Sequence, residues 1–175
     1  ILSKNKNIIL NDINKKRIRL LNTNLKRLKF KAKIKNQDIL NMNSNEKYDF
    51  IILDAPCSAV GTIRKNPEIF FKSSEPDLNS LKTLQEKMLE KASILLNNKG
   101  IILYMVCSFL KVETIEQIDK FLLKNNNFIL DEFYLSNENI KYKDLIKNKY
   151  MLTLPTNLND YTIDGYFAAF LKKKD

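Results

Sequence analysis

The chain has 175 residues and a net charge of +10, with 44% hydrophobic and 29% charged residues, a composition that allows one folded domain and argues against intrinsic disorder. It contains no histidine and two cysteines, which excludes histidine-based catalysis, histidine metal ligands and a four-cysteine zinc site, so we expect no metal. No apolar run is long enough to cross a membrane and no signal peptide is visible, so we expect a cytoplasmic protein with reduced thiols.

The first part of the chain reads as strand, helix, strand. Apolar residues over 7–11 predict a short strand that ends at Asp12, and residues 32–37 predict a second strand that ends at Asp38. The helix is predicted over 14–28, where four apolar side chains recur at helical spacing: Ile18, Leu21, Leu25 and Leu28. Because the chain starts at Ile1 rather than Met, we expect it to be part of a longer protein whose N-terminal portion is absent.

Residues 15–35 carry ten Lys or Arg and no acid. A basic block of this kind suits a polyanion such as RNA, and it includes Lys26 and Arg27 as candidate RNA-binding residues. The alternative is that part of the excess charge reflects the enrichment in Lys, Asn and Ile throughout the chain, so that the block is only a solvated surface.

The rest of the chain continues the alternation. Near-continuous apolar runs over 49–54 and 101–106 predict strands that are buried on both faces. A long loop with Pro and Gly follows the first of them, and Asn97, Asn98 and Gly100 are expected to end the helix that comes next. The further predicted elements are helices over 77–97 and 111–125 and strands over 127–134 and 165–171, with an uncertain polar stretch over 136–150.

This order predicts one α/β domain over residues 1–175, with a mostly parallel sheet and an antiparallel last strand pair. Ligands of such sheets bind beyond the carboxyl ends of the strands, so the polar residues there are the candidates for function. We expect them all at one edge of the sheet: Asp12, Asp38, Asp54, Cys57 and Cys107.

The acids at the first two strand ends suit a nucleoside ligand. Asp12 is placed to accept hydrogen bonds from ribose hydroxyls, and Asp38 could contact an adenine amino group. The alternative is that each is a turn or helix-capping residue, since Asp is common at both. No Gly-rich phosphate loop is present, and the loop that would carry it lies before residue 1.

Both cysteines occur as Cys-Ser just after a buried strand, in FIILDAPCS and IILYMVCS. Neighbouring parallel strands lie about 4.8 Å apart, so Cys57 and Cys107 are expected to face one crevice. The alternatives are two small buried hydrophobic residues, or a nucleophilic thiolate with a helper thiol. Arg64 and Lys65 follow in the same loop, where they could hold RNA phosphates or form an exposed charged surface.

With these residues in view, the chain resembles the RNA 5-methylcytosine methyltransferases of the Sun/Nop2 (NSUN) type, to which a bacterial 16S rRNA enzyme belongs. The resemblance covers nearly the whole chain and rests on NIILNDINKKRIRLLNTNLKRLKF, NQDIL, DAPCSAVGTIRKNPEI, CSFLKVET and DGYFAAFL. The departures are Val106 in place of a usual Thr, Thr114 in place of a frequent Asn, and Ala59 in place of a common Gly. The family's Gly-rich cofactor loop is absent from this chain.

The resemblance implies a Rossmann-like class I fold, N-terminally truncated here, and S-adenosyl-L-methionine as the methyl donor. It implies that Cys107 adds to C6 of cytosine, that Cys57 assists removal of the C5 proton and enzyme release, and that Asp54 contacts the cytosine edge. Asp12 and Asp38 would then hold the ribose and the adenine of the cofactor, and Asp54 is a candidate for cofactor binding as well as for catalysis. The implied substrate is 16S ribosomal RNA, with tRNA and a non-catalytic RNA-binding module as the alternatives.

Overall fold

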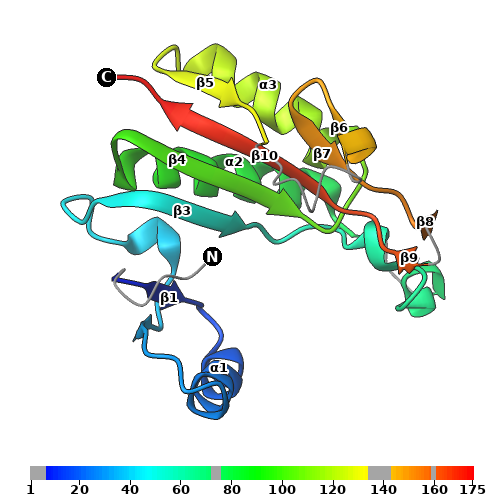
Figure 1. Cartoon of the computed structure of the whole chain (residues 1–175), viewed down its shortest axis with the longest axis horizontal. Helices are drawn as coiled ribbons and strands as arrows, with labels where there is room; N and C mark the ends of the chain where they lie inside the picture. The colour runs from blue at the N-terminus through cyan, green and yellow to red at the C-terminus, as the bar shows by residue number, and fades with distance from the viewer. Residues whose placement is uncertain (1–6, 72–75, 134–142, 159–160) are drawn as a thin grey trace. The chain divides into compact units, whose positions relative to one another are not determined.

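The computed structural model describes residues 7–71, 76–133, 143–158 and 161–175, which form two compact units. The first unit is Ile1–Glu46 and the second is Lys47–Asp175. Each unit has its own strands and helices (Figure 1). Among the described residues, no helix is both long and apolar enough to cross a membrane.

The first unit has the predicted order of strand, helix, strand. β1 (Ile9–Asn11) pairs in parallel with β2 (Lys33–Lys35), and α1 (Lys15–Arg27) connects them. The helix begins where the Asn14 side chain accepts hydrogen bonds from the backbone N–H groups of Lys16 and Arg17, which would otherwise lack partners. A short 3-10 helix, η1 (Ile39–Asn41), follows β2.

The second unit is built on a six-stranded sheet with helices on one of its faces (Figure 1). β3 (Tyr48–Asp54) lies parallel to β4 (Leu96–Val106), and α2 (Leu78–Leu95) makes the crossover between them. The other elements are η2 (Val60–Thr62), η3 (Pro67–Phe71), η4 (Lys111–Glu113), α3 (Ile115–Lys124), β5 (Phe128–Asp131), β6 (Ile146–Lys147), β7 (Tyr150–Leu152), β8 (Thr156–Leu158), β9 (Tyr161–Ile163) and β10 (Phe167–Lys173).

β10 lies in the middle of this sheet and runs against its neighbours. It pairs antiparallel with β4 on one side and with β5 and β7 on the other, and β6 extends the sheet beyond β7. β5 therefore runs in the same direction as β3 and β4, and the predicted antiparallel pairing of 127–134 with 165–171 is confirmed. β8 and β9 form a separate hairpin.

Two details of the predicted sheet are wrong. The described strands pair in three sheets rather than one, because β1 with β2 and β8 with β9 each form a sheet of their own. The strand that follows α2 starts at Leu96, so Asn97, Asn98 and Gly100 lie inside β4, where they form an irregularity against β3 instead of a helix-terminating loop. Lys99 has a φ of 60° at this point.

The core of the second unit lies between β4, β10 and the two helices. Every second residue of β4 is buried from Gly100 onward, and Tyr104 packs edge-on against Phe167 of β10. β3 departs from the expectation of burial on both faces, because Phe50 and Ile52 are 49% and 60% exposed. The reason is that α2 and α3 both lie on the same face of the sheet (Figure 1).

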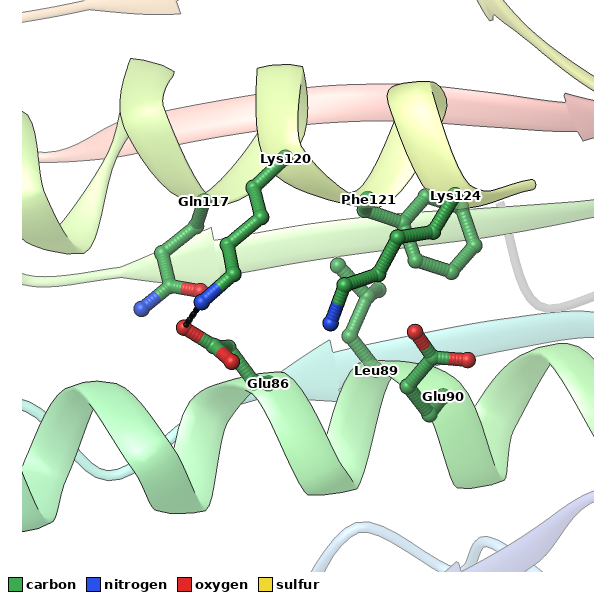
Figure 2. Close-up of a pocket in the computed structure, with 7 residues that line it drawn as sticks. All are labelled: Glu86, Leu89, Glu90, Gln117, Lys120, Phe121 and Lys124. Carbon is green, nitrogen blue, oxygen red and sulfur yellow. Dashed lines mark hydrogen bonds and ion pairs between the residues drawn. The ribbon is translucent and has the colours of Figure 1, made fainter. Parts of the chain in front are cut away.

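α2 and α3 pack side by side and line a small pocket on that face (Figure 2). Lys120 of α3 forms an ion pair with Glu86 of α2 at 2.5 Å, and the apolar side chains of Leu89 and Phe121 lie beside this pair. Gln117 donates from α3 to the side chain of Gln85 at 3.1 Å. This last bond connects the helix pair to the site described next.

Candidate active site

The two cysteines lie on turns that follow neighbouring parallel strands. β3 and β4 are in register up to Asp54 and Met105, and the Ala55 N–H donates to the Met105 carbonyl at 3.0 Å. The turns that follow bring Cys57 Sγ and Cys107 Sγ to 3.3 Å from each other. Both thiols are free and partly exposed, so the structure confirms the expectation that the two thiols lie close together.

The short distance between the two sulfur atoms changes their acidity. The hydrogen bond from the Cys57 thiol is the main cause that lowers the pKa of Cys107 to about 7, against burial and the charges of Asp54 and Glu113, which raise it. The same hydrogen bond, with burial, raises the pKa of Cys57. The pair therefore loses one proton easily and holds the second one, so Cys107 is the better nucleophile near neutral pH.

Two glycines fix the backbone around Cys107. The Gly61 N–H donates to the Cys107 carbonyl at 3.0 Å, and the Gly165 N–H donates to the Gly61 carbonyl at 2.7 Å. A Cβ atom on Gly61 would lie 1.9 Å from the Gly165 carbonyl oxygen, so only glycine allows this approach. Ala59, which stands where the related motif has glycine, has a φ of 60° and so adopts the left-handed conformation that glycine favours.

Arg64 and Lys65, predicted to hold phosphates, form ion pairs with Asp164. The Asp164 side chain is 3% exposed and accepts from Arg64 Nη2 at 2.9 Å and from Lys65 Nζ at 2.5 Å. The hydrogen bond from Lys65 and the charges of both cations hold the pKa of Asp164 below its usual range in spite of burial. Both cations keep exposed surface, so these pairs brace the loop that follows Cys57 and leave donors for a ligand.

A second buried carboxylate, Glu113, was missed by the sequence analysis as a site residue. Glu113 is fully buried and accepts from the Ser58 N–H at 2.8 Å, from the Ser58 hydroxyl at 2.5 Å and from Gln85 Nε2 at 3.1 Å. The tyrosine of β4, Tyr104, donates to the Glu113 carbonyl at 2.9 Å, and burial raises the pKa of this phenol. Its position in CSFLKVET was the available signal, but its partners are distant in sequence.

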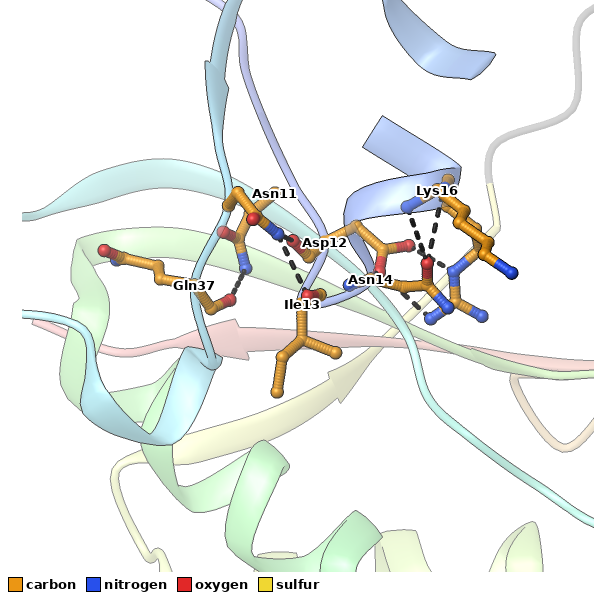
Figure 3. Close-up of polar contacts among 8 residues, drawn as sticks. Asn11, Asp12, Ile13, Asn14, Lys16 and Gln37 are labelled. Atoms are coloured by element: carbon orange, nitrogen blue, oxygen red, sulfur yellow. Dashed lines mark hydrogen bonds and ion pairs between the residues drawn. The ribbon is translucent and has the colours of Figure 1, made fainter. Parts of the chain in front are cut away.

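Asp12 and Asp38 follow the neighbouring parallel strands of the first unit, as predicted. Asp12 accepts from the Asn14 N–H at 2.7 Å (Figure 3). Its carboxylate also forms an ion pair with Arg17 at 2.7 Å. Burial raises the pKa of Asp12, but the hydrogen bonds and charge of Arg17 and the Asn14 N–H outweigh it, so the net direction is down. Asp38 accepts from the Leu40 N–H at 3.0 Å at the start of η1.

Both acids thus have the turn and capping contacts of the alternative interpretation. Each carboxylate keeps lone pairs beyond those contacts, so the donor set still fits hydroxyl or amino groups of a nucleoside. The strand ends that carry them are linked, because Asn11 Nδ2 donates to the Gln37 carbonyl at 3.0 Å (Figure 3). Lys26 and Arg27 lie in the last turn of α1, where positive charge is favourable.

Comparison with known proteins gives a consistent result. The family model described as 16S rRNA methyltransferase RsmB/F matches residues 1–172. Ribosomal RNA small subunit methyltransferase B of Cronobacter sakazakii is 39% identical over 123 residues, and that of Shewanella oneidensis is 37% identical over 123 residues. Each alignment covers 69% of this chain and 29% of the relative, so the chain matches less than a third of their length.

A solved structure extends the comparison to the fold. NSun6 from Pyrococcus horikoshii, determined with SFG, superposes with a TM-score of 0.76 at 25% sequence identity. The match covers 97% of this chain and 42% of that protein. The mixed sheet with β10 antiparallel between β4 and β5 is therefore a class I methyltransferase arrangement.

Proposed function

The chain belongs to the 16S rRNA methyltransferase RsmB/F family, and from this premise we propose that the protein methylates C5 of a cytosine in RNA, with 16S ribosomal RNA as the substrate. The observation that carries the proposal is the pair of thiols 3.3 Å apart beyond two parallel strands. C5 of cytosine is a poor nucleophile, and one thiol is needed to activate the ring and one group to take the C5 proton. We further propose that residues 1–175 act as one catalytic region in the cytoplasm.

In this reaction Cys107 is the nucleophile. Its thiolate forms a bond from Sγ to C6, and the electron pair of the C5–C6 double bond moves toward C5 and the ring. S-adenosyl-L-methionine, when bound, supplies the sulfonium methyl group that C5 takes. The hydrogen bond from the Cys57 thiol lowers the pKa of Cys107, and this direction supports its role because the thiolate is the nucleophilic form.

Cys57 and Asp54 complete the proposed site. As the electron pair moves into the ring, the Cys57 thiol passes its proton to N3, and the Cys57 thiolate then takes the C5 proton, directly or through water. The bond from Sγ to C6 breaks and releases Cys107 as a thiolate, and the methylated base gives up its N3 proton to solvent. Asp54, exposed at the end of β3, hydrogen-bonds the cytosine edge at N3 and N4 as charge develops on the ring. The target base must leave its stack to reach the thiols, so an unpaired or opened RNA segment is the substrate form.

We propose that Asp12 and Asp38 hold the ribose and the adenine of S-adenosyl-L-methionine. What supports this is their place after two neighbouring parallel strands and their acceptor chemistry. The basic residues of the first unit, including Lys26 and Arg27, and the partly exposed Arg64 and Lys65 are proposed to contact RNA phosphates.

Two cysteine variants test the mechanism. Cys107→Ala should abolish methyl transfer, because no bond to C6 can form. Cys57→Ala should instead accumulate protein covalently bound to RNA, visible as a slow band on a denaturing gel with labelled RNA, because release is blocked. A Cys57→Ala protein that turns over normally without a trapped band contradicts the assignment. Mapping of the methylated position in 16S rRNA and tRNA then identifies the substrate.

A measurement without RNA tests the thiol pair itself. The rate at which iodoacetamide alkylates Cys107 should rise with a midpoint near pH 7. In Cys57→Ala the midpoint should move up, because the hydrogen bond that stabilises the thiolate is lost. An unchanged midpoint in this variant shows that the two thiols do not share a proton.

A further inference from the structure

Glu113 is a buried acid whose contacts join the two cysteine turns. Ser58, which donates to it twice, immediately follows Cys57. Glu113 itself lies in η4, the turn that follows Cys107 and Ser108. The Ser58 and Ser108 hydroxyls also lie 3.4 Å apart, and the Leu110 N–H donates to the Ser108 hydroxyl at 3.2 Å. A side chain of one turn therefore holds the backbone of the other.

The same carboxylate is fixed from the helix side. Gln85 of α2 donates to Glu113 at 3.1 Å and also to the Pro56 carbonyl at 2.9 Å, so it contacts the residue before Cys57 as well. Gln117 of α3 holds Gln85 in turn at 3.1 Å. Cys57 thus lies between two residues whose backbone atoms are both bonded to this network, Pro56 and Ser58.

The composition of the network favours a role in geometry. Three donors from Ser58 and Gln85 converge on a group that, when ionised, only accepts, and the structure gives Glu113 no cation among the described residues. A buried acid without a cationic partner costs more than an apolar side chain of similar size, so stability alone does not explain it. What the carboxylate adds is a fixed connection between the backbone at Ser58 and the turn after β4.

We propose that Glu113 is a positioning residue that sets the distance and orientation of the Cys57 and Cys107 thiols by tying the turn after β3 to the turn after β4. The inference rests on the proposed function, in which both thiols act on one base. A displacement of about 1 Å at a reacting group can cost on the order of a hundredfold in rate, so such a connection matters for catalysis. The charge of Glu113 also raises the pKa of Cys107, which gives a second, separable effect.

The test uses phenylarsine oxide, which captures two thiols only when they lie close together. Both thiol protons leave with the oxide oxygen as water while two As–S bonds form, and no oxidation state changes. The wild-type protein should bind one equivalent. Glu113→Ala should bind at least about tenfold more weakly, because the second thiol loses its high effective concentration. The matched control is Glu116→Ala, which removes an exposed acid three positions away.

Conservative replacement separates geometry from charge. Glu113→Gln keeps an acceptor for the Ser58 N–H and should capture the arsenical within about threefold of the wild type. Its Cys107 alkylation midpoint should move to lower pH, because a negative charge is removed. Unchanged capture by a folded Glu113→Ala protein overturns the proposal. If Glu113→Ala does not fold, Glu113→Met decides, because it fills a similar volume and accepts no hydrogen bond from the Ser58 N–H: unchanged capture there overturns the proposal and weaker capture supports it.

Arsenical capture does not depend on RNA, so the two proposals fail separately. Weaker capture by Glu113→Ala, together with a wild-type protein that does not methylate RNA, supports the positioning role and overturns the proposed reaction. Normal methylation by Glu113→Ala with an unchanged kcat overturns the positioning role and leaves the reaction in place.

Discussion

Two buried carboxylates, Glu113 and Asp164, flank the thiol pair and are held in different ways. Neutral donors surround Glu113: the Ser58 N–H and hydroxyl and the Gln85 amide. Asp164 is held by the cations Arg64 and Lys65, which are 37% and 62% exposed, and its backbone carbonyl accepts from the Thr153 hydroxyl at 2.7 Å. The contacts of Glu113 lie inside the core, whereas the ion pairs of Asp164 extend to the protein surface.

The difference separates two kinds of sensitivity. Hydrogen bonds from buried neutral groups do not respond to salt, and losing one leaves a buried polar group without a partner. Ion pairs with exposed cations are screened by salt and are weakened when the acid is protonated. We therefore expect the hydrogen bonds of Glu113 to be insensitive to salt and the ion pairs of Asp164 to weaken at high salt and at low pH.

The largest effect is expected at Gly61, which connects the two sides through Cys107 and Gly165. In Gly61→Ala the new methyl group would meet the Gly165 carbonyl at 1.9 Å, so the backbone must move. We expect a loss of at least about 3 kcal/mol in the free energy of unfolding, measured by urea denaturation. Ala59→Gly in the same loop is the comparison, because it removes a methyl group from a residue with a φ of 60° and should not destabilise the protein. A Gly61→Ala protein of wild-type stability would show that the close approach to Gly165 is not needed.

Asp164→Asn should have a smaller effect than Gly61→Ala. The variant keeps the shape of the side chain and loses its charge, and Arg64 and Lys65 can turn to water because they are partly exposed. At low salt we expect Asp164→Asn to melt at a lower temperature than the wild type. At high salt we expect the two melting temperatures to lie closer together, because salt screens the ion pairs of the wild type. Glu113→Gln should show no such narrowing, and equal salt dependence in the two variants would remove the distinction.

Acid should weaken the Asp164 side first. The pKa of Asp164 is lower in the folded protein than the 3.8 of an ordinary Asp side chain. The ionised carboxylate therefore stabilises the fold fully above pH 3.8, and this stabilisation is lost as the pH falls from 3.8 to the lower pKa of the folded protein. The difference in stability between the wild type and Asp164→Asn should therefore shrink below about pH 4. The check is a series of urea denaturations, with Glu116→Gln as the control for general charge effects.

The smallest effect is expected at Lys65. Its ion pair is largely exposed, so Lys65→Ala should change the free energy of unfolding by no more than about 1 kcal/mol. If Lys65 also contacts an RNA phosphate, Lys65→Ala should make the plot of log binding constant for RNA against log salt concentration less steep by about one unit. If neither the free energy of unfolding nor the salt dependence of RNA binding changes in Lys65→Ala, then Lys65 neither stabilises the loop nor contacts RNA.

The sequence was informative where the strand pattern is local. FIILDAPCS and IILYMVCS predicted that Cys57 and Cys107 follow neighbouring parallel strands, and the geometry follows from strand spacing. The antiparallel β5 and β10 were found for the same reason. The short strands β6 to β9 were missed, because two or three residues carry no detectable alternation.

The sequence was not informative where a residue's partner is distant. Arg64 and Asp164 are a hundred positions apart, and Ser58 and Glu113 are 55 apart. The loop sequence around Arg64 and Lys65 does not contain their partner, which is why the sequence predicted phosphate contacts or an exposed charged surface and not the ion pairs with Asp164. Burial of one sheet face also depends on helices that a strand pattern does not place, as Phe50 and Ile52 show.

The central place of β10 bears on how the second unit assembles during synthesis. Ribosomes make β4, β5 and β7 before β10, yet in the part of the chain that the structure describes each of these three strands pairs with β10 and none pairs with another of the three. Until residues 165–173 emerge, β4 lacks its β10 partner, and Gly61, which donates to the Cys107 carbonyl, lacks its hydrogen bond from Gly165. We expect the sheet, and with it the reactive sulfur pair, to mature late and through contacts between distant segments, which form slowly.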